Sequence, residues 1–354
     1  MAAEVGEAAE AVDDDASLSA KMEIGKTGIL FSLFFGGEMK SAKVASQRRA
    51  CMWLVLSLLF IAASMLAYSL SYGASAPQQK SFASADEAVK AAVAAARKGD
   101  EKELTAIFGP GSAELMHSGD AVADKQRRSE FLKAYDEKNR LVTEGENTVL
   151  VVGKNDWPLP IPLVKKGNGW GFDATKGKEE VLNRRIGQNE LNTIQVALAY
   201  VDAQREYAMK DRDGDGLLEY AQGFRSDGGK KNGLYWPAKS GEEQSPLGEL
   251  AARAVKAGYK AGDKPFPFHG YYYRILTAQG KDASGGAYSY IVKGSMIGGF
   301  ALVAYPAEYG NSGVMTFIVN HDGKVFQKDL GKGTGTVAAA MKEYNPDKTW
   351  AAVK

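Results

Sequence analysis

The longest helical pattern in the chain lies between residues 190 and 210. Apolar residues recur there at three- and four-residue steps, the spacing that places side chains on one face of a helix. They are Leu191, Ile194, Leu198, Val201 and Ala208. Asn189 is a suitable N-cap, because its short side chain can accept from the N–H groups of the first turn. A helix from Glu190 to Lys210 would be about 30 Å long, and we expect it to be the spine of a domain.

Short strand patterns dominate the sequence after residue 268. They are separated by glycine-rich turns, and Asp322-Gly323 is typical of a tight hairpin turn. One long helix followed by regular strands predicts an antiparallel sheet packed on that helix. We assign this domain to residues 179–350. Its expected strands are Tyr271–Ala278, Ala287–Val292, Phe300–Tyr305, Val314–Val319 and Lys324–Lys328.

In the first half, helical patterns come before strand patterns. The expected elements are helices from Ser84, Glu101 and Asp124, then strands over 148–152, 157–164 and 169–173. Trp157, Trp170 and Phe172 are expected in the core, because aromatic side chains dominate buried area. We assign residues 81–175 to an α+β domain. Helices followed by a curved sheet resemble the cone-shaped folds of the nuclear transport factor two type, and this resemblance implies a cone-like domain.

An apolar run of 19 residues without a charge extends from Met52 to Leu70, after several basic residues. It is typical of a signal peptide or transmembrane anchor, placed at residues 51–73; a buried core helix is the alternative. Basic residues stay cytoplasmic, so the rest would be exported: periplasmic, or tethered to the bacterial inner membrane through residues 52–70. Residues 1–50 are either a disordered leader or a mis-annotated start upstream of Met39.

Composition narrows the function classes. The net formal charge is +1 over 354 residues, so no overall basic field would hold nucleic acid. The single cysteine, Cys51, leaves the chain beyond it without disulfides or thiol nucleophiles. The three histidines have no zinc-ligand spacing. The sequence assigns no catalytic residue and no organic cofactor.

The densest acidic cluster directly follows the long helix and matches part of a calcium-loop pattern. Three carboxylates at the negative end of a helix dipole favour a cation; the alternative is a solvated Asp/Gly turn. A glutamine stands where strong sites have a bidentate glutamate, so weak Ca²⁺ binding is expected. The expected ligands are Asp211, Asp213, Asp215, Leu217, Glu219 and Gln222.

The stretch from His269 to Arg274 is a second candidate site. On a strand, Tyr271 and Tyr273 share one face, while Tyr272 and Arg274 share the other. The stretch is therefore a candidate surface on which a sugar or peptide could stack. The alternative is that one face belongs to the core and the other to the surface. The candidate ligand residues are His269, Tyr271, Tyr273 and Arg274.

Long motifs cover nearly all of residues 82–350. They are Asp156-Trp-Pro-Leu-Pro-Ile-Pro, Leu182-Asn-Arg-Arg-Ile-Gly, Ala199-Tyr-Val-Asp-Ala-Gln-Arg-Glu-Tyr, Asp211-Arg-Asp-Gly-Asp-Gly, Gly233-Leu-Tyr-Trp-Pro, His269-Gly-Tyr-Tyr-Tyr-Arg-Ile-Leu and Phe317-Ile-Val-Asn-His-Asp-Gly. The chain thereby resembles an uncharacterised family of exported bacterial proteins, domain of unknown function 2950, whose name implies no activity. The second half is also similar in architecture to pilin and pseudopilin head domains, although here a whole domain separates the apolar run from the long helix.

These patterns predict an exported α+β protein of the bacterial envelope. Its leading function is a non-catalytic structural or binding module with a calcium-stabilised loop. The alternative is a periplasmic enzyme acting on peptide or glycan near His269 and the tyrosines. The expected partners are the inner membrane and an envelope protein or glycan, and no nucleic acid.

Overall fold

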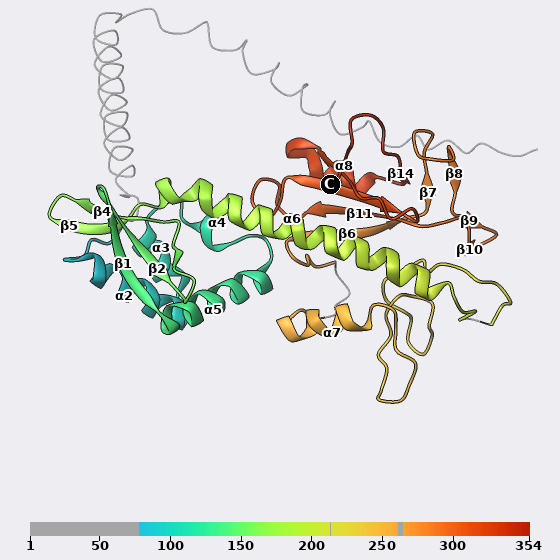
Figure 1. The fold of residues 1–354 in the computed structure, drawn as a ribbon, viewed down its shortest axis with the longest axis horizontal. Coiled ribbons are helices and arrows are strands. Elements are labelled where there is room, and N and C mark those ends of the chain that lie inside the picture. The colour runs from blue at the N-terminus through green and yellow to red at the C-terminus, as the bar shows by residue number, and fades with distance from the viewer. Residues whose placement is uncertain (1–77, 213, 261–264) are drawn as a thin grey trace, which may run out of the picture. The chain divides into compact units, whose positions relative to one another are not determined.

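The computed structural model describes residues 78–212, 214–260 and 265–354. The described residues belong to one compact unit. The expected leader (1–50) and signal or anchor (51–73) lie outside the described residues. Within the described part, no helix combines the length and the hydrophobicity needed to cross a bilayer. Helices and mainly antiparallel sheets alternate along the chain, which confirms the α+β class (Figure 1).

The first half starts with four helices: α2 (Ala85–Lys98), α3 (Glu101–Phe108), α4 (Ala113–Met116) and α5 (Ala121–Glu137). The start of α2 is as predicted, because the Ser84 hydroxyl accepts from the Glu87 N–H at 3.2 Å. Gly99 ends the helix in the left-handed region, with φ at 67°. Local capping chemistry therefore fixes both ends of α2.

A five-stranded antiparallel sheet follows, in the order β1-β2-β4-β5, with β3 also paired to β2. Helices α2 and α3 pack against β5, and α5 packs against β1 and β2. The strands are β1 (Asn139–Glu144), β2 (Asn147–Val152), β3 (Trp157–Pro158), β4 (Leu163–Lys166) and β5 (Gly169–Phe172). These helices and strands share one hydrophobic cluster.

Helix α6 (Ala174–Tyr207) is common to both halves. It begins directly after β5, where the Asp173 carboxylate accepts from the Lys176 N–H at 3.2 Å. The predicted start at Glu190 is therefore wrong. Asn189, the predicted cap, lies inside the helix and is 1% exposed. Its side-chain amide is engaged in tertiary hydrogen bonds rather than in capping.

The second half carries a larger antiparallel sheet in the order β15-β13-β12-β11-β6, with α6 packed against β11 and β12. Two small sheets, β10-β9 and β14-β7-β8, accompany it, and β14 pairs with β7 in parallel. The helices are α7 (Gly248–Ala257), α8 (Thr334–Ala340) and the short η1 (Gly331–Gly333). The strands are β6 (Tyr271–Leu276), β7 (Ala278–Gln279), β8 (Tyr288–Ser289), β9 (Ile291–Val292), β10 (Ser295–Met296), β11 (Ala301–Pro306), β12 (Met315–Asn320), β13 (Phe326–Asp329), β14 (Glu343–Tyr344) and β15 (Ala351–Ala352).

Candidate functional site

The first half contains a cavity of about 570 Å³ between its helices and its sheet. Small-molecule sites in proteins usually have volumes of roughly 300–1,000 Å³ and mostly apolar walls. The cavity meets both criteria. Its apolar lining consists of Val89, Ala92, Val93, Ala96, Leu104, Phe108, Leu115, Met116, Phe131, Ala134, Leu150, Val152, Trp157, Leu159, Pro160, Ile161, Phe172 and Val181.

The composition of α2 explains why this space is hollow. Val89, Ala92, Val93 and Ala96 recur at three- and four-residue steps and face the cavity. A row of alanine and valine is apolar enough to turn inward but too short to fill the space in front of the sheet. The helix therefore lines a cavity instead of closing a packed core.

Helix α6 closes another side of the cavity. A Cβ atom at Gly177 would lie 2.7 Å from both the Ile161 Cα atom and the Pro160 carbonyl oxygen. Only glycine permits this close approach without displacing the backbone. The contact fixes the proline-rich segment between β3 and β4 against α6, and this segment lines the cavity.

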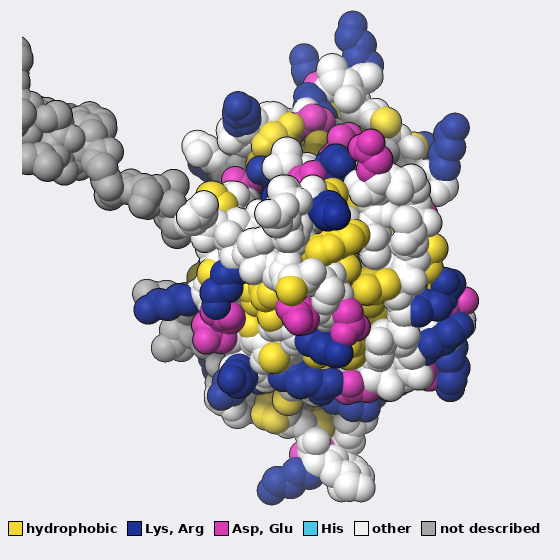
Figure 2. Space-filling view, turned by 90° about the vertical axis from the view of Figure 1, so that its left-hand side faces the viewer, with side chains coloured by type: hydrophobic (Ala, Val, Ile, Leu, Met, Phe, Trp, Pro, Cys, Tyr) yellow, Lys and Arg dark blue, Asp and Glu magenta, His cyan; other side chains and the backbone are white. Residues whose placement is uncertain are grey.

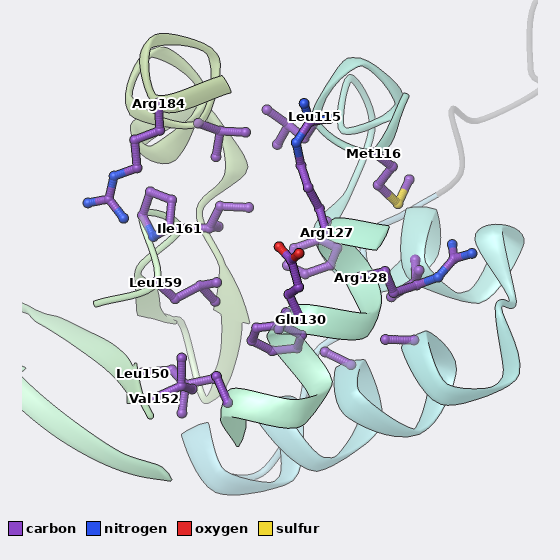
Figure 3. Close-up of a pocket in the computed structure, with 18 of the residues that line it drawn as sticks. Leu115, Met116, Arg127, Arg128, Glu130, Leu150, Val152, Leu159, Ile161 and Arg184 are labelled. Atoms are coloured by element: carbon purple, nitrogen blue, oxygen red, sulfur yellow. The ribbon is translucent and has the colours of Figure 1, made fainter. Parts of the chain in front are cut away.

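Among the described residues, all charged lining residues come from two helices. They are Asp124, Arg127, Arg128 and Glu130 on α5, and Arg184 and Arg185 on α6. Figure 3 shows Leu150, Leu159 and Ile161 across the space from the α5 side chains. Figure 2, which views the molecule from the end that carries β5 in Figure 1, shows hydrophobic side chains gathered in the middle of that face, with charged side chains around them. The cavity thus has apolar walls and a charged side.

Arg185 is a buried cation beside the cavity, with 6% of its surface exposed. Its guanidinium donates to the Glu114 carbonyl at 2.9 Å, to the Leu115 carbonyl and to the Asn311 side chain. Within the described part of the chain, no carboxylate lies within ion-pair distance of it. Burial, followed by the neighbouring charge of Arg127, lowers the pKa of Arg185. Neutral acceptors alone therefore contact this positive charge.

Arg127 connects the cavity to the second half. Its guanidinium donates to the Asp124 carboxylate at 3.2 Å and to the Asn189 side-chain oxygen at 2.7 Å. The Asn189 amide donates in turn to the Ser312 carbonyl at 2.8 Å. These contacts tie α5, α6 and the segment before β12 into one polar network.

Asp120, the N-cap of α5, makes a second connection. Its carboxylate is 1% exposed and accepts from the Tyr259 hydroxyl at 2.7 Å and the Gly270 N–H at 3.0 Å. Burial and the carboxylate together raise the pKa of Tyr259, so the phenol stays protonated as a donor. The helix that carries most of the cavity charges is thus fixed at its start.

Trp157 lines the cavity but is 58% exposed, so its predicted core position is wrong. The Arg184 guanidinium lies 4.9 Å from the centroid of its ring, a cation–π contact. Phe172, by contrast, is fully buried, as predicted, and Trp170 is half-buried. The exposed indole therefore lies where the cavity lining reaches the surface.

Asp211 and Asp215 organise the acidic loop through their carboxylates. Asp211 accepts from the Gly214 N–H at 2.7 Å and from the Gly216 N–H at 3.0 Å. Asp215 accepts from the Leu217 N–H at 2.8 Å. The loop turns sharply at Gly216, whose backbone lies in the left-handed region with φ at 87°.

The remaining expected calcium ligands are spread along the loop. Asp213 lies outside the described residues, and Glu219 is half-buried. The Gln222 side chain donates to the Gly294 carbonyl at 2.6 Å. Among the described residues, no three His, Cys, Asp or Glu side chains lie together as a metal-binding group. The calcium site stays a prediction.

The structure places the His269 stretch against α6. The Tyr271 hydroxyl donates to the Met315 carbonyl at 3.0 Å, and the Tyr273 hydroxyl donates to the Phe268 carbonyl at 3.2 Å. Burial lowers the pKa of His269, whose backbone lies in the left-handed region with φ at 54°. Both tyrosine hydroxyls therefore have partners within the protein.

Arg274 lies on the same strand and contacts a different element. Its guanidinium donates to the Ala338 carbonyl at 2.9 Å and to the Met341 carbonyl, at the C-terminal end of α8. A cation is favourable at this negative end of a helix. The structure therefore gives Arg274 a contact with α8, and the ligand surface at residues 269–274 stays a prediction.

The sequence did not predict the cavity. One signal was present: the inward face of α2 consists only of alanine and valine, in a half otherwise supplied with phenylalanine and tryptophan. The charged residues gave no signal, because Arg185 on α6 is far in sequence from Asp124 and Arg127 on α5, and all three have ordinary helical surroundings.

The comparisons with known proteins cover both halves. A protein-family model described as Protein of unknown function (DUF2950) matches residues 79–353, which confirms the resemblance given by the motifs. Neither a curated protein nor a solved structure matches the chain.

Proposed function

We propose that this chain, which belongs to the family described as Protein of unknown function (DUF2950), is a non-catalytic binding module for an apolar small molecule. The observation that carries the proposal is the cavity of about 570 Å³ with its apolar lining. Space of this kind costs stability, because its walls lose packing contacts. Burial of an apolar ligand would recover that loss and would provide the binding free energy.

Displacement or uptake of an uncharged fluorescent probe, N-phenyl-1-naphthylamine, tests this function. Ala92→Phe places a ring in the cavity and is expected to weaken probe binding by the full-length chain at least tenfold. Ala94→Phe adds the same ring on the exposed face of the same helix and is expected to leave binding unchanged. Equal binding by wild type and Ala92→Phe, or no binding by wild type, would contradict the proposal.

The finer architecture and the location belong to the same proposal. The first half is cone-like, supported by helices packed on a five-stranded sheet around a cavity, and the second half is pilin-head-like, supported by α6 on an antiparallel sheet. The chain is exported and faces the envelope, on the strength of the apolar run at 52–70. Cell fractionation tests the location: recovery of the native chain from the cytosol alone would contradict it.

Calcium in the loop at residues 211–222 completes this proposal. Extracellular calcium modules bind with dissociation constants of roughly 10⁻⁴–10⁻³ M, and we expect that range here. Calorimetric titration of the full-length chain, with Asp211→Asn as the matched variant, tests it. Binding by wild type and weaker binding by the variant are expected. No heat of binding at millimolar calcium would remove the site.

The alternative function is an enzyme that acts on peptide or glycan near His269. It is favoured by one observation: burial lowers the pKa of the half-buried His269, and titratable groups with a shifted pKa are frequent at functional sites. Hydrolysis of peptidoglycan fragments by wild type, lost in His269→Gln, would support it. Equal rates in both proteins would exclude His269.

A further inference from the structure

We propose that the cavity ligand is an anionic amphiphile, an apolar chain ending in a carboxylate or phosphate head, and that Arg127 binds this head. The inference rests on the proposed function, because it names the ligand class of the same cavity. It is carried by the distribution of polarity around the cavity and by the excess of arginines over carboxylates among its described lining residues.

The cavity is polarised across its width. Every described lining residue contributed by α2, α3 and the sheet is apolar, whereas all the charged lining residues lie on α5 and α6. An entirely apolar ligand would place hydrocarbon against these charges and cost them solvation. A ligand with one polar end satisfies both sides when its chain lies against Ala92 and Phe172 and its head faces α5 and α6.

The charged side carries an excess of positive charge. Four arginines line the cavity, against the carboxylates of Asp124 and Glu130. Arg185 is buried, and in the described part of the chain only neutral groups accept its hydrogen bonds, while the Asp124 and Glu308 carboxylates act on it electrostatically from further away. Further negative charge close to a buried cation is favourable. An anionic head group would add negative charge on this side of the cavity.

Arg127 is the arginine placed to meet the head. Its side chain is 34% exposed and makes its ion pair with Asp124 through Nη1. No hydrogen bond from its Nε–H is present among the described residues, so the guanidinium retains donor capacity. Figure 3 shows the Arg127 side chain extending toward Leu115, at the charged side of the cavity. The planar guanidinium matches carboxylate and phosphate oxygens.

Three ligands with the same ten-carbon chain test the inference: decanoate, decyl phosphate and decanol. Each displaces the uncharged fluorescent probe from the full-length chain, so their dissociation constants can be compared directly. We expect wild type to bind at least one of the anions about tenfold more tightly than decanol, as charge-assisted hydrogen bonds imply. The tighter of the two anions identifies the head as carboxylate or phosphate.

Arg127→Gln is expected to reduce this anion-to-alcohol ratio to about one while decanol binding stays within about twofold of wild type. Retained decanol binding shows that the cavity is intact, so the variant reports on the head group alone. Lys133→Gln removes the same charge from an exposed, non-lining position of α5 and should leave the ratio unchanged.

Two results would overturn the inference while the binding function stands: equal affinity of wild type for anions and decanol, or an unchanged ratio in Arg127→Gln. If wild type bound neither the probe nor any of the three ligands, both proposals would be overturned.

Discussion

The two halves of the molecule have a similar architecture, but one contains a cavity and the other a filled core. In each, helices pack against an antiparallel sheet of five strands. The inward face of α2 in the first half consists of alanine and valine, and a cavity remains. The second half fills the equivalent space with large rings that are fully buried, including Tyr200, Phe300 and Phe317. Side-chain volume, rather than the arrangement of elements, accounts for the cavity in the first half and the filled core in the second.

Helix α6 belongs to both arrangements and shows the change along its own length. Val181 and Arg185 line the cavity near its start. Nearer the C-terminal end of the helix, Tyr200 packs edge-to-face on Phe300 with ring centroids 5.6 Å apart, within the core of the second half. The helix that lines the cavity near its start thus also packs into the core of the second half.

The largest loss of stability is expected when a ring is removed from the core of the second half. Phe300→Ala removes a fully buried ring that also contacts Tyr220 at a centroid distance of 4.8 Å. It should lower the free energy of unfolding by about 3–5 kcal/mol, the usual cost of a large cavity. Phe131→Ala, at a half-buried ring already lining the cavity, should cost less than half as much. Urea denaturation measures both; equal losses would contradict the contrast between the halves.

A smaller loss of stability is expected when a side chain in the same core is enlarged. Ala301→Leu adds bulk to a site with no exposed surface in the second core and should cost about 1–3 kcal/mol of unfolding free energy. Ala96→Leu adds the same bulk where the cavity has room, and should be neutral or slightly stabilising. The same denaturation experiment compares them. A larger loss in Ala96→Leu than in Ala301→Leu would show that the cavity walls are already packed.

The smallest effect concerns a surface cluster of the second half. The Lys210 ammonium, together with Lys231 and Arg212, lowers the pKa of Glu243 from 4.5 to about 2. A carboxylate with a lowered pKa contributes stability above its unfolded-state pKa, and this contribution is lost as pH falls from about 4.5 toward 2. The side chain is 32% exposed, so solvent screening reduces the contribution to about 1 kcal/mol.

Glu243→Gln tests this pH dependence. Between pH 6 and pH 3, wild type should lose about 0.5 kcal/mol more unfolding free energy than the variant, because the rest of the contribution is lost only as pH falls toward 2. Glu242→Gln changes a neighbouring exposed carboxylate and should follow wild type. Parallel curves for wild type and Glu243→Gln would exclude the effect.

Regular, amphipathic elements were predictable from the sequence. Elements that depend on tertiary contacts with distant residues were not. Ser84 caps the start of α2 as expected, and Gly99 ends the helix, because capping depends on local chemistry. Strand β1 (Asn139–Glu144) was missed, because most of its residues are exposed and polar and it is held mainly by pairing with β2. Local signals cannot reveal a strand that depends on its partner.

The start of α6 was missed for a related reason. Residues 174–189 lack a clean apolar stripe, since this part of the helix packs through Gly177 and through buried polar groups such as Arg185 and Asn189. Trp157 was misplaced because hydrophobicity alone does not distinguish a core ring from one at the edge of a cavity. Each error concerns a residue whose role is set by residues distant in sequence.

The central claim is that the cavity of the first half binds an apolar ligand. A crystal structure of the full-length chain soaked with dodecanol carrying a terminal bromine tests it directly, because anomalous scattering locates the bromine without reference to any assumed pose. The account predicts a bromine peak inside the cavity, next to Ala92 and Phe172. A cavity without bromine, with peaks only on the outer surface, would contradict it.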